Sequence, residues 1–274
     1  MNGFMDKLSE KILPLANALG QNRYLTVLRD AFMLSFPITM FGSIVVVLNN
    51  LPFFSDATKG TLGTLFGNGQ NATMSIMTVF VTFGIGYYLS KSYDVEGIFG
   101  GAVSFASFLI LTPFFMTTES GETISGVLSL DRLGAKGMFI GMIAAFLAAE
   151  IYCRITKRGW QIKMPDGVPE MVTKSFTSLI PAVVIASLFG IVKFGFSVTS
   201  YNSATDFVYT LLQEPLQRLT GSLTAFLVLI LISNLLWFFG IHGSMTVLPI
   251  LMPIFLGYLA DNSAAVAAGE AVPH

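Results

Sequence analysis

The sequence predicts an all-α membrane protein, a polytopic helical bundle with about six transmembrane helices, and three observations lead to this class. Apolar residues make up 53% of the chain and charged residues only 11%, against about 25% charged residues in soluble domains. The mean hydropathy is +0.71. Several runs with few or no charges are long enough to cross the hydrocarbon core of a bilayer as helices. The formal net charge of −1 indicates no nucleic-acid partner.

Residues 1–25 are predicted to form an amphipathic helix that lies on the membrane surface. Apolar residues recur there at helical spacing, with acidic and basic residues between them. A leader helix packed on a partner protein is the alternative. The mixed charges do not fit a cleavable signal peptide, so we expect the first span to direct membrane insertion.

Five spans are predicted between residues 31 and 194. Each is an apolar run of helical length. Their expected ranges are 31–48, 73–90, 98–115, 137–155 and 176–194. The stretch 55–71 is rich in Gly, Asn and Thr and is expected to be a loop, as is the polar segment 117–136.

The remainder of the chain is predicted to contain shorter and more irregular elements. Residues 203–220 carry an apolar stripe among polar residues, which predicts an interfacial helix. The sixth span is expected at 223–239. Residues 243–274 are apolar but contain prolines and an Asp-Asn-Ser turn at 261–263. We interpret them as a truncated re-entrant segment, the start of a re-entrant hairpin, with an ordinary kinked seventh span as the alternative.

The distribution of basic residues predicts the orientation of the chain. With six spans, about two thirds of the 15 Lys and Arg residues lie on the side of the N-terminus and of the 154–174 loop. The positive-inside rule therefore places the N-terminus in the cytoplasm, and segments 117–136 and 195–222 face outward. The lone Cys153 forms no internal disulfide.

The most informative stretch is the end of the sixth span, where a Gly-Ile-His-Gly tetrapeptide (240–243) follows a run without charges. The two glycines allow the backbone to leave helical geometry. Irregular backbone at membrane depth is tolerated where it is buried in protein or lines an aqueous cavity, which makes His242 a candidate site residue. A structural hydrogen bond is the alternative for His242. Helix–helix contact is the alternative for Asn234, and an interface anchor is the alternative for Trp237.

Motifs for other chemistries do not occur. The sequence contains no nucleotide-binding loop, metal-ligand cluster or redox dithiol, and its 2 histidines exclude a histidine-rich metal site. The sequence therefore assigns no catalytic residue, no cofactor and no metal.

The stretch 233–243, Ser-Asn-Leu-Leu-Trp-Phe-Phe-Gly-Ile-His-Gly, closely resembles the end of the sixth span in the membrane IIC components of the bacterial phosphotransferase system. The resemblance is to the lactose/cellobiose/diacetylchitobiose group, and it covers this whole chain but only the N-terminal part of the family's length. It implies a multi-pass permease subunit of the bacterial cell membrane. Such a subunit carries a disaccharide inward and presents its 6-hydroxyl to a phosphocysteine on a cytoplasmic IIB protein. The implied partners are the disaccharide, IIB, the lipid bilayer and a second copy in a homodimer.

The resemblance also assigns residues. His242 matches the family histidine that hydrogen-bonds the sugar, and Gly243, Asn234 and Trp237 are the other expected substrate-binding residues. The family's glutamate motif of the Asn-Glu-Pro type is absent, and Glu270 in Gly-Glu-Ala does not match it. The chain by itself is therefore not expected to phosphorylate a sugar.

Two other classes of function remain open at this point. One is an ion-coupled secondary transporter, which is disfavoured because the spans hold no carboxylates near their centres. The other is a non-catalytic truncated fragment that acts as a scaffold or receptor.

Overall fold

The computed structural model of the protein describes residues 21–49, 51, 53–118, 121–213, 215, 221–238 and 243–273. In these ranges the chain is mostly helical, which confirms the helical character of the predicted class. The chain divides into two compact units. The larger is Ala31–Tyr209, and the smaller combines Met1–Asp30 with Thr210–His274.

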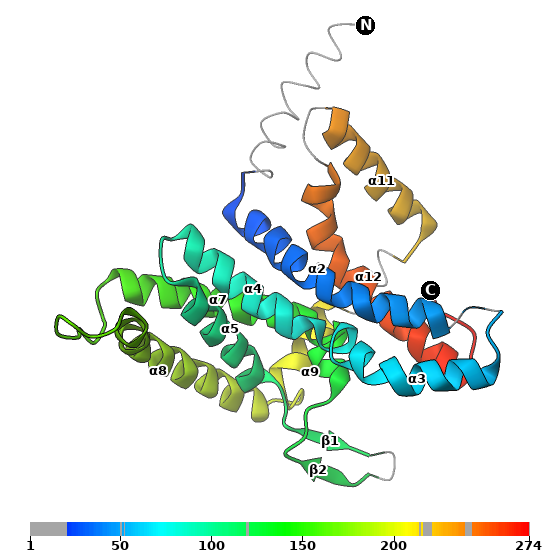
Figure 1. Cartoon of the computed structure of the whole chain (residues 1–274), viewed down its shortest axis with the longest axis horizontal. Coiled ribbons are helices and arrows are strands. Elements are labelled where there is room, and N and C mark those ends of the chain that lie inside the picture. The colour runs from blue at the N-terminus through cyan, green and yellow to red at the C-terminus, as the bar shows by residue number, and fades with distance from the viewer. Residues whose placement is uncertain are drawn as a thin grey trace, which may run out of the picture. The chain divides into compact units, whose positions relative to one another are not determined.

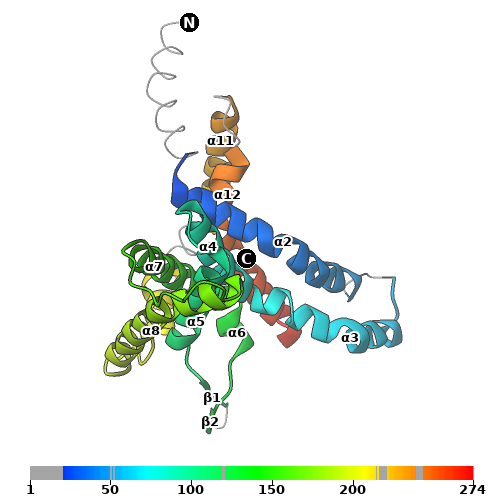
Figure 2. The same ribbon diagram turned by 60° about the vertical axis from the view of Figure 1, so that its left-hand side comes forward.

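The larger unit is built around helices that pack side by side (Figures 1 and 2). They are α4 (Met77–Ser92), α5 (Gly97–Leu111), α7 (Met138–Lys157) and α8 (Glu170–Ser197). Their shared core contains large side chains from α5, α7 and α8, among them Phe108, Tyr152 and Ile185, with Ala144 and Ala148 of α7 filling the space between. Because each of these segments is helical, its backbone hydrogen bonds are made within the segment, as a membrane requires.

Small residues bring α4 and α5 close together. A Cβ atom added to Gly86 would meet the carbonyl oxygen of Gly100, and one added to Gly100 would meet the hydroxyl of Ser90. Membrane helices associate through such close contacts because burial from lipid supplies little hydrophobic driving force. Gly86 and Gly100 therefore mark a close backbone contact between α4 and α5.

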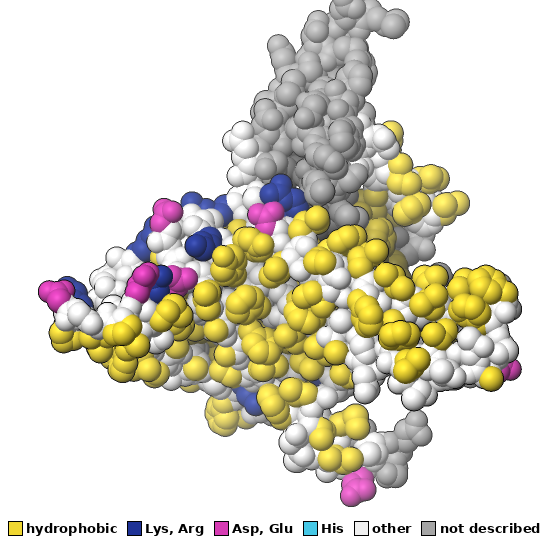
Figure 3. Space-filling view, in the orientation of Figure 1, with side chains coloured by type: hydrophobic (Ala, Val, Ile, Leu, Met, Phe, Trp, Pro, Cys, Tyr) yellow, Lys and Arg dark blue, Asp and Glu magenta, His cyan; other side chains and the backbone are white. Residues whose placement is uncertain are grey.

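The surroundings of helix α8 are different, because much of its apolar surface is exposed. Val183, Ile191 and Phe194 are among its exposed apolar side chains. Figure 3 shows hydrophobic side chains over much of this face of the larger unit. The helix between Lys174 and Lys193 is about 28 Å long, which matches the roughly 30 Å hydrocarbon core of a bilayer.

The structure corrects the prediction for residues 55–71. Helix α2 (Arg23–Asn49) passes through Pro37, and it is followed by α3 (Asp56–Asn71) instead of a loop. The hydroxyl of Ser55 caps α3 by accepting the amide of Thr58 at 3.3 Å. The acidic Asp56 lies in the first turn, where the helix dipole favours it. These start signals outweigh the low helix propensity of the glycines. A short 3₁₀ turn, η1 (Met74–Ile76), leads into α4.

The expected third span is shorter than predicted. Helix α5 ends at Leu111 because Thr112, which precedes Pro113, adopts an extended conformation. A hairpin follows, with β1 (Phe115–Thr117) antiparallel to β2 (Thr123–Ser125), and Met116 lies opposite Ile124. The short helices α6 (Leu130–Leu133) and η2 (Ala135–Gly137) then lead into α7. Part of the predicted loop 117–136 therefore has regular secondary structure.

The predicted interfacial helix 203–220 is not one continuous α-helix. The structure has α9 (Ala204–Val208) followed by η3 (Tyr209–Gln213), which is a π-helix. The side chain of Ser203 caps α9 by accepting the amide of Asp206 at 3.0 Å. Most of the rest of this predicted helix lies outside the described residues, as does most of the predicted N-terminal helix 1–25.

In the smaller unit, α11 (Leu223–Phe238) packs on α12 (Gly243–Ala268). Helix α12 continues through its prolines and through residues 261–263, so the turn predicted there is wrong. The alanines that follow this tripeptide are strong helix formers, and they override its turn preference.

Several described helices have the length and composition of membrane spans. The stretches that meet both criteria are Arg23–Val45, Asp56–Ser92, Ala135–Lys157 and Glu170–Ser197. Two shorter apolar helical stretches are Gly97–Leu111 and Leu223–Asn234.

Candidate functional site

The predicted site residues that the structure describes lie near the end of α11 and at the start of α12. Asn234 is exposed on α11, and its amide nitrogen Nδ2 donates to the carbonyl oxygen of Ile230 at 2.8 Å. Trp237 lies in the last turn of α11, and Gly243 is the first residue of α12. His242 lies outside the described residues. Asn234 and Trp237 thus lie near the end of α11 and Gly243 at the start of α12, and the roles of all four residues stay predictions.

One end of the larger unit carries an ion-pair cluster. The ammonium of Lys174, at the start of α8, lies 2.8 Å from Glu96 Oε2 and 2.7 Å from Glu170 Oε1. Glu96 immediately precedes α5, so the cluster joins the α4–α5 turn to α8. The hydrogen bond from Lys174 holds the pKa of Glu96 below its usual value, against a smaller opposing effect of burial.

A further acidic side chain at this end is also paired. Glu150, near the end of α7, accepts the hydroxyl of Tyr93 at 2.7 Å and pairs with Arg154 at 3.2 Å. An ion-coupled transporter needs carboxylates that exchange partners with the transported ion. The engagement of Glu150 with these two groups gives no support to that class.

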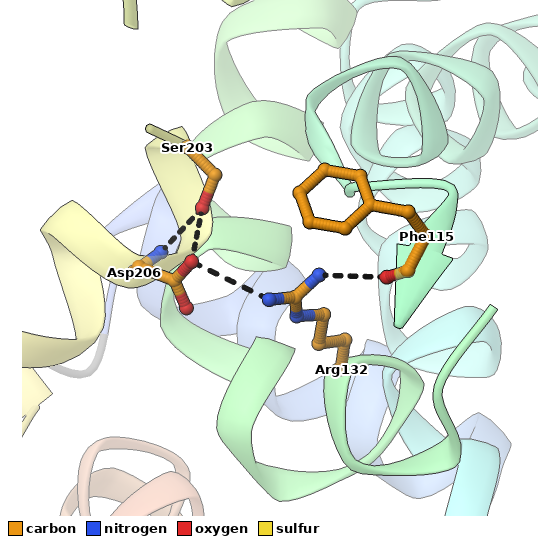
Figure 4. Close-up of polar contacts among 4 residues, drawn as sticks. All are labelled: Phe115, Arg132, Ser203 and Asp206. Carbon is orange, nitrogen blue, oxygen red and sulfur yellow. Dashed lines mark hydrogen bonds and ion pairs between the residues drawn. The ribbon is translucent and has the colours of Figure 1, made fainter. Parts of the chain in front are cut away.

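A second polar cluster joins three segments that are far apart in the sequence (Figure 4). Arg132 of α6 lies 3.4 Å from Asp206 Oδ2 of α9 and donates to the carbonyl oxygen of Phe115 in β1, also at 3.4 Å. Its guanidinium group lies over the Phe115 ring, 5.7 Å from the centroid. Asp206 also accepts the hydroxyl of Ser203 at 2.7 Å. We refer to Arg132, Asp206, Ser203 and Phe115 as the Arg132 cluster.

Sequence reasoning missed both polar clusters. The available signal was the presence of Glu96, Arg132, Lys174 and Asp206 in a chain with few charges, but their pairing spans long sequence separations. Within the described ranges, His, Cys, Asp and Glu residues nowhere form a group of three or more that could hold a metal ion.

These features define a largely apolar helical bundle whose described helices include several with the length and composition of membrane spans. The model of the family "Phosphotransferase system, EIIC" matches residues 29–274. The chain belongs to this family.

Named relatives and one solved structure agree with the family match. The chain is 47% identical over 273 residues to the "PTS system oligo-beta-mannoside-specific EIIC component" of Bacillus subtilis (strain 168), covering 98% of the chain and 62% of that protein. It is 33% identical to the "PTS system cellobiose-specific EIIC component" of Geobacillus stearothermophilus, covering 96% of the chain and 60% of that protein.

The solved structure is that of "the transporter ChbC, the IIC component from the N,N'-diacetylchitobiose-specific phosphotransferase system". The chain matches it with a TM-score of 0.89 and 32% identity, over 97% of the chain and 64% of that structure. This chain therefore spans about three fifths of the length of the proteins that it matches, and the fold is that of a IIC transporter.

Proposed function

We propose that this chain is part of a sugar-translocating IIC permease. The complete protein binds a disaccharide of the cellobiose, diacetylchitobiose or lactose class and carries it across the membrane for phosphorylation by phospho-IIB. The observation that carries the proposal is the family match over residues 29–274, which includes the Gly-Ile-His-Gly tetrapeptide at 240–243. The names of the relatives, which refer to β-linked oligosaccharides and disaccharides, support the substrate class.

His242 is the residue that most directly tests this proposal. In the complete protein, His242→Ala removes a hydrogen bond to a sugar hydroxyl, which weakens disaccharide binding by about one to two decades in Kd. His274→Ala is the matched control, because it removes the other histidine of this chain. Equilibrium binding of labelled cellobiose and diacetylchitobiose to the purified proteins measures both effects. Equal affinities for wild type and His242→Ala would assign the histidine a structural role.

The membrane topology forms a second part of the proposal. Six spans cross the bilayer, the N-terminus is cytoplasmic, and α12 forms one limb of a re-entrant hairpin. The four long apolar stretches and the two shorter ones support the number of spans. The length of α8 between its two lysines supports a transmembrane position for that helix.

Impermeant thiol reagents test this topology. Single cysteines replace Ser125 and Lys163 in a variant in which Cys153 is changed to serine. A reagent added outside intact cells is expected to label position 125 and to leave position 163 unmodified. The opposite labelling pattern would reverse the proposed orientation.

The proposed partners are a cytoplasmic IIB protein and a second copy of the chain. Phosphoryl transfer depends mainly on positioning and on electrostatic stabilisation, and the donor group arrives on IIB. Membership of the EIIC family supports the first partner. The exposed apolar faces of α2 and α8 are compatible with the second.

A further inference from the structure

We propose that Arg132 and Asp206 are positioning residues of the transport cycle. They hold the segment 203–209 on the larger unit, so that the chain enters the smaller unit from a fixed point. This inference rests on the proposed function, because it concerns the rate at which the complete protein moves a sugar. The inference assigns a role to charged residues that lie outside the candidate site at 234–243.

The Arg132 cluster is poorly exposed for a group of charged residues. The Arg132 side chain is 18% exposed and that of Asp206 is 33% exposed. Charged residues in such surroundings contribute little net stability, because their desolvation offsets much of their attraction. In some proteins such pairing instead favours one arrangement of the backbone over others. Here the arrangement is that of α9 against α6 and β1.

Aromatic and cation–π contacts also hold the segment 203–209. Phe207 packs on the rings of Phe196 and Tyr201, with centroid separations of 5.2 and 5.1 Å. The ammonium of Lys136 lies 4.9 Å from the centroid of the Tyr209 ring. These contacts therefore hold the segment 203–209 on the larger unit as far as Tyr209.

The segment 203–209 ends where the two compact units meet in the sequence. The larger unit ends at Tyr209 and the second part of the smaller unit begins at Thr210. The π-helix η3, Tyr209–Gln213, begins at this boundary. π-Helical turns are rare and frequently occur at functional sites. Alternating access in transporters is largely a rigid-body movement of one bundle against another, and the Arg132 cluster holds the part of the larger unit that directly precedes the boundary in the sequence.

The test uses charge-neutral and charge-conserving variants in the complete protein. Asp206→Asn and Arg132→Gln remove the ion pair, whereas Arg132→Lys keeps the positive charge. Asp131→Asn is the matched control, because it removes a carboxylate from an exposed neighbour of Arg132 in the same short helix. Each protein is reconstituted into vesicles, and both the uptake of labelled disaccharide with phospho-IIB and the Kd of the disaccharide are measured. Amide hydrogen exchange of residues 203–213 is recorded for the same proteins.

The two neutral variants are expected to lower the maximal uptake rate roughly three- to tenfold and to leave the Kd unchanged within about twofold. Exchange at 203–209 becomes faster in these variants, while Arg132→Lys restores part of the rate and Asp131→Asn behaves as wild type. Unchanged uptake and exchange in both neutral variants would overturn the positioning role. A parallel loss of binding, uptake and melting temperature without recovery in Arg132→Lys would also overturn it. A wild-type protein that neither binds nor takes up a disaccharide would contradict the proposed function itself.

Discussion

Helices α4 and α8 belong to the same bundle but are attached to it in different ways. Gly86 of α4 lies so close to α5 that an added Cβ atom would meet the Gly100 carbonyl, whereas a Cβ atom at Gly190 of α8 would meet nothing within 4 Å. Helix α8 is linked through longer side chains instead. Lys174 pairs with Glu96 near one end, and Lys193 lies 5.9 Å from the centroid of the Phe114 ring near the other.

The difference shows two solutions to helix association in a lipid environment. Close backbone approach maximises van der Waals contact and requires small residues at the contact. Attachment through polar and aromatic groups leaves the apolar face of a helix open, as it is at Val183 and Ile191 of α8. The first kind of contact tolerates little change in volume, whereas the second depends on individual hydrogen bonds and charges.

The largest effect is expected for a substitution at the α4–α5 contact. Gly86→Val forces the two helices apart and is expected to destabilise the protein by about 2–3 kcal/mol. Gly190→Val is the matched control, with an expected change within about 0.5 kcal/mol. Thermal and denaturant unfolding in detergent micelles measures both variants. Similar losses for the two would show that α4 and α8 are not attached in different ways.

An intermediate effect is expected for the buried polar link between α7 and α8. The hydroxyl of Ser178 lies 3.0 Å from that of Tyr152, which is only 1% exposed. Ser178→Ala removes this partner and is expected to lower the free energy of unfolding by about 1 kcal/mol. The control is Ser197→Ala, which removes only an exposed hydrogen bond to Phe194 of its own helix. An equally large loss of unfolding free energy in Ser197→Ala would show that the effect comes from helix propensity and not from the contact with Tyr152.

The smallest effect is expected for the ion pair between Glu96 and Lys174. The pKa of Glu96 is lower in the folded state than in the unfolded chain. The pair therefore adds stability at pH values above the unfolded value of about 4.3, and this contribution is lost as pH falls through the lower folded value. Melting curves between pH 7 and acidic pH are expected to show this loss of stability in wild type and in the control Glu122→Gln. If Glu96→Gln loses the same stability at low pH, the loss belongs to other groups.

Much of the fold was predictable because membrane helices are specified locally. A run such as 176–194 needs only length and few charges to be recognised, and α8 covers it. The errors occurred where local signals compete. At 55–71 the glycines suggested a loop, but the Ser55 cap and the helical continuation produced α3. At 261–263 a polar tripeptide suggested a turn, and the helix formers that follow it overrode the signal.

The residues of the candidate site stay predictions, and their proximity needs no tertiary contact. Asn234, Trp237 and Gly243 are close in sequence, so chain connectivity alone keeps their backbones near one another. Arg132 and Asp206 lie far apart in sequence, and periodicity relates no such pair. Their contact follows from the packing of α6, β1 and α9.

The sequence by itself determined the helical membrane class, most of the apolar segments and the tetrapeptide that marks the candidate site. These features depend on hydropathy and on local backbone preference, which act within a few turns of a helix. Only the tertiary structure decided that Gly86 meets Gly100, that Lys174 joins Glu96, and that Arg132 holds Asp206. Such contacts require two segments to reach one place with matching shape and charge, and this match arises from helix packing and not from any single stretch of the chain.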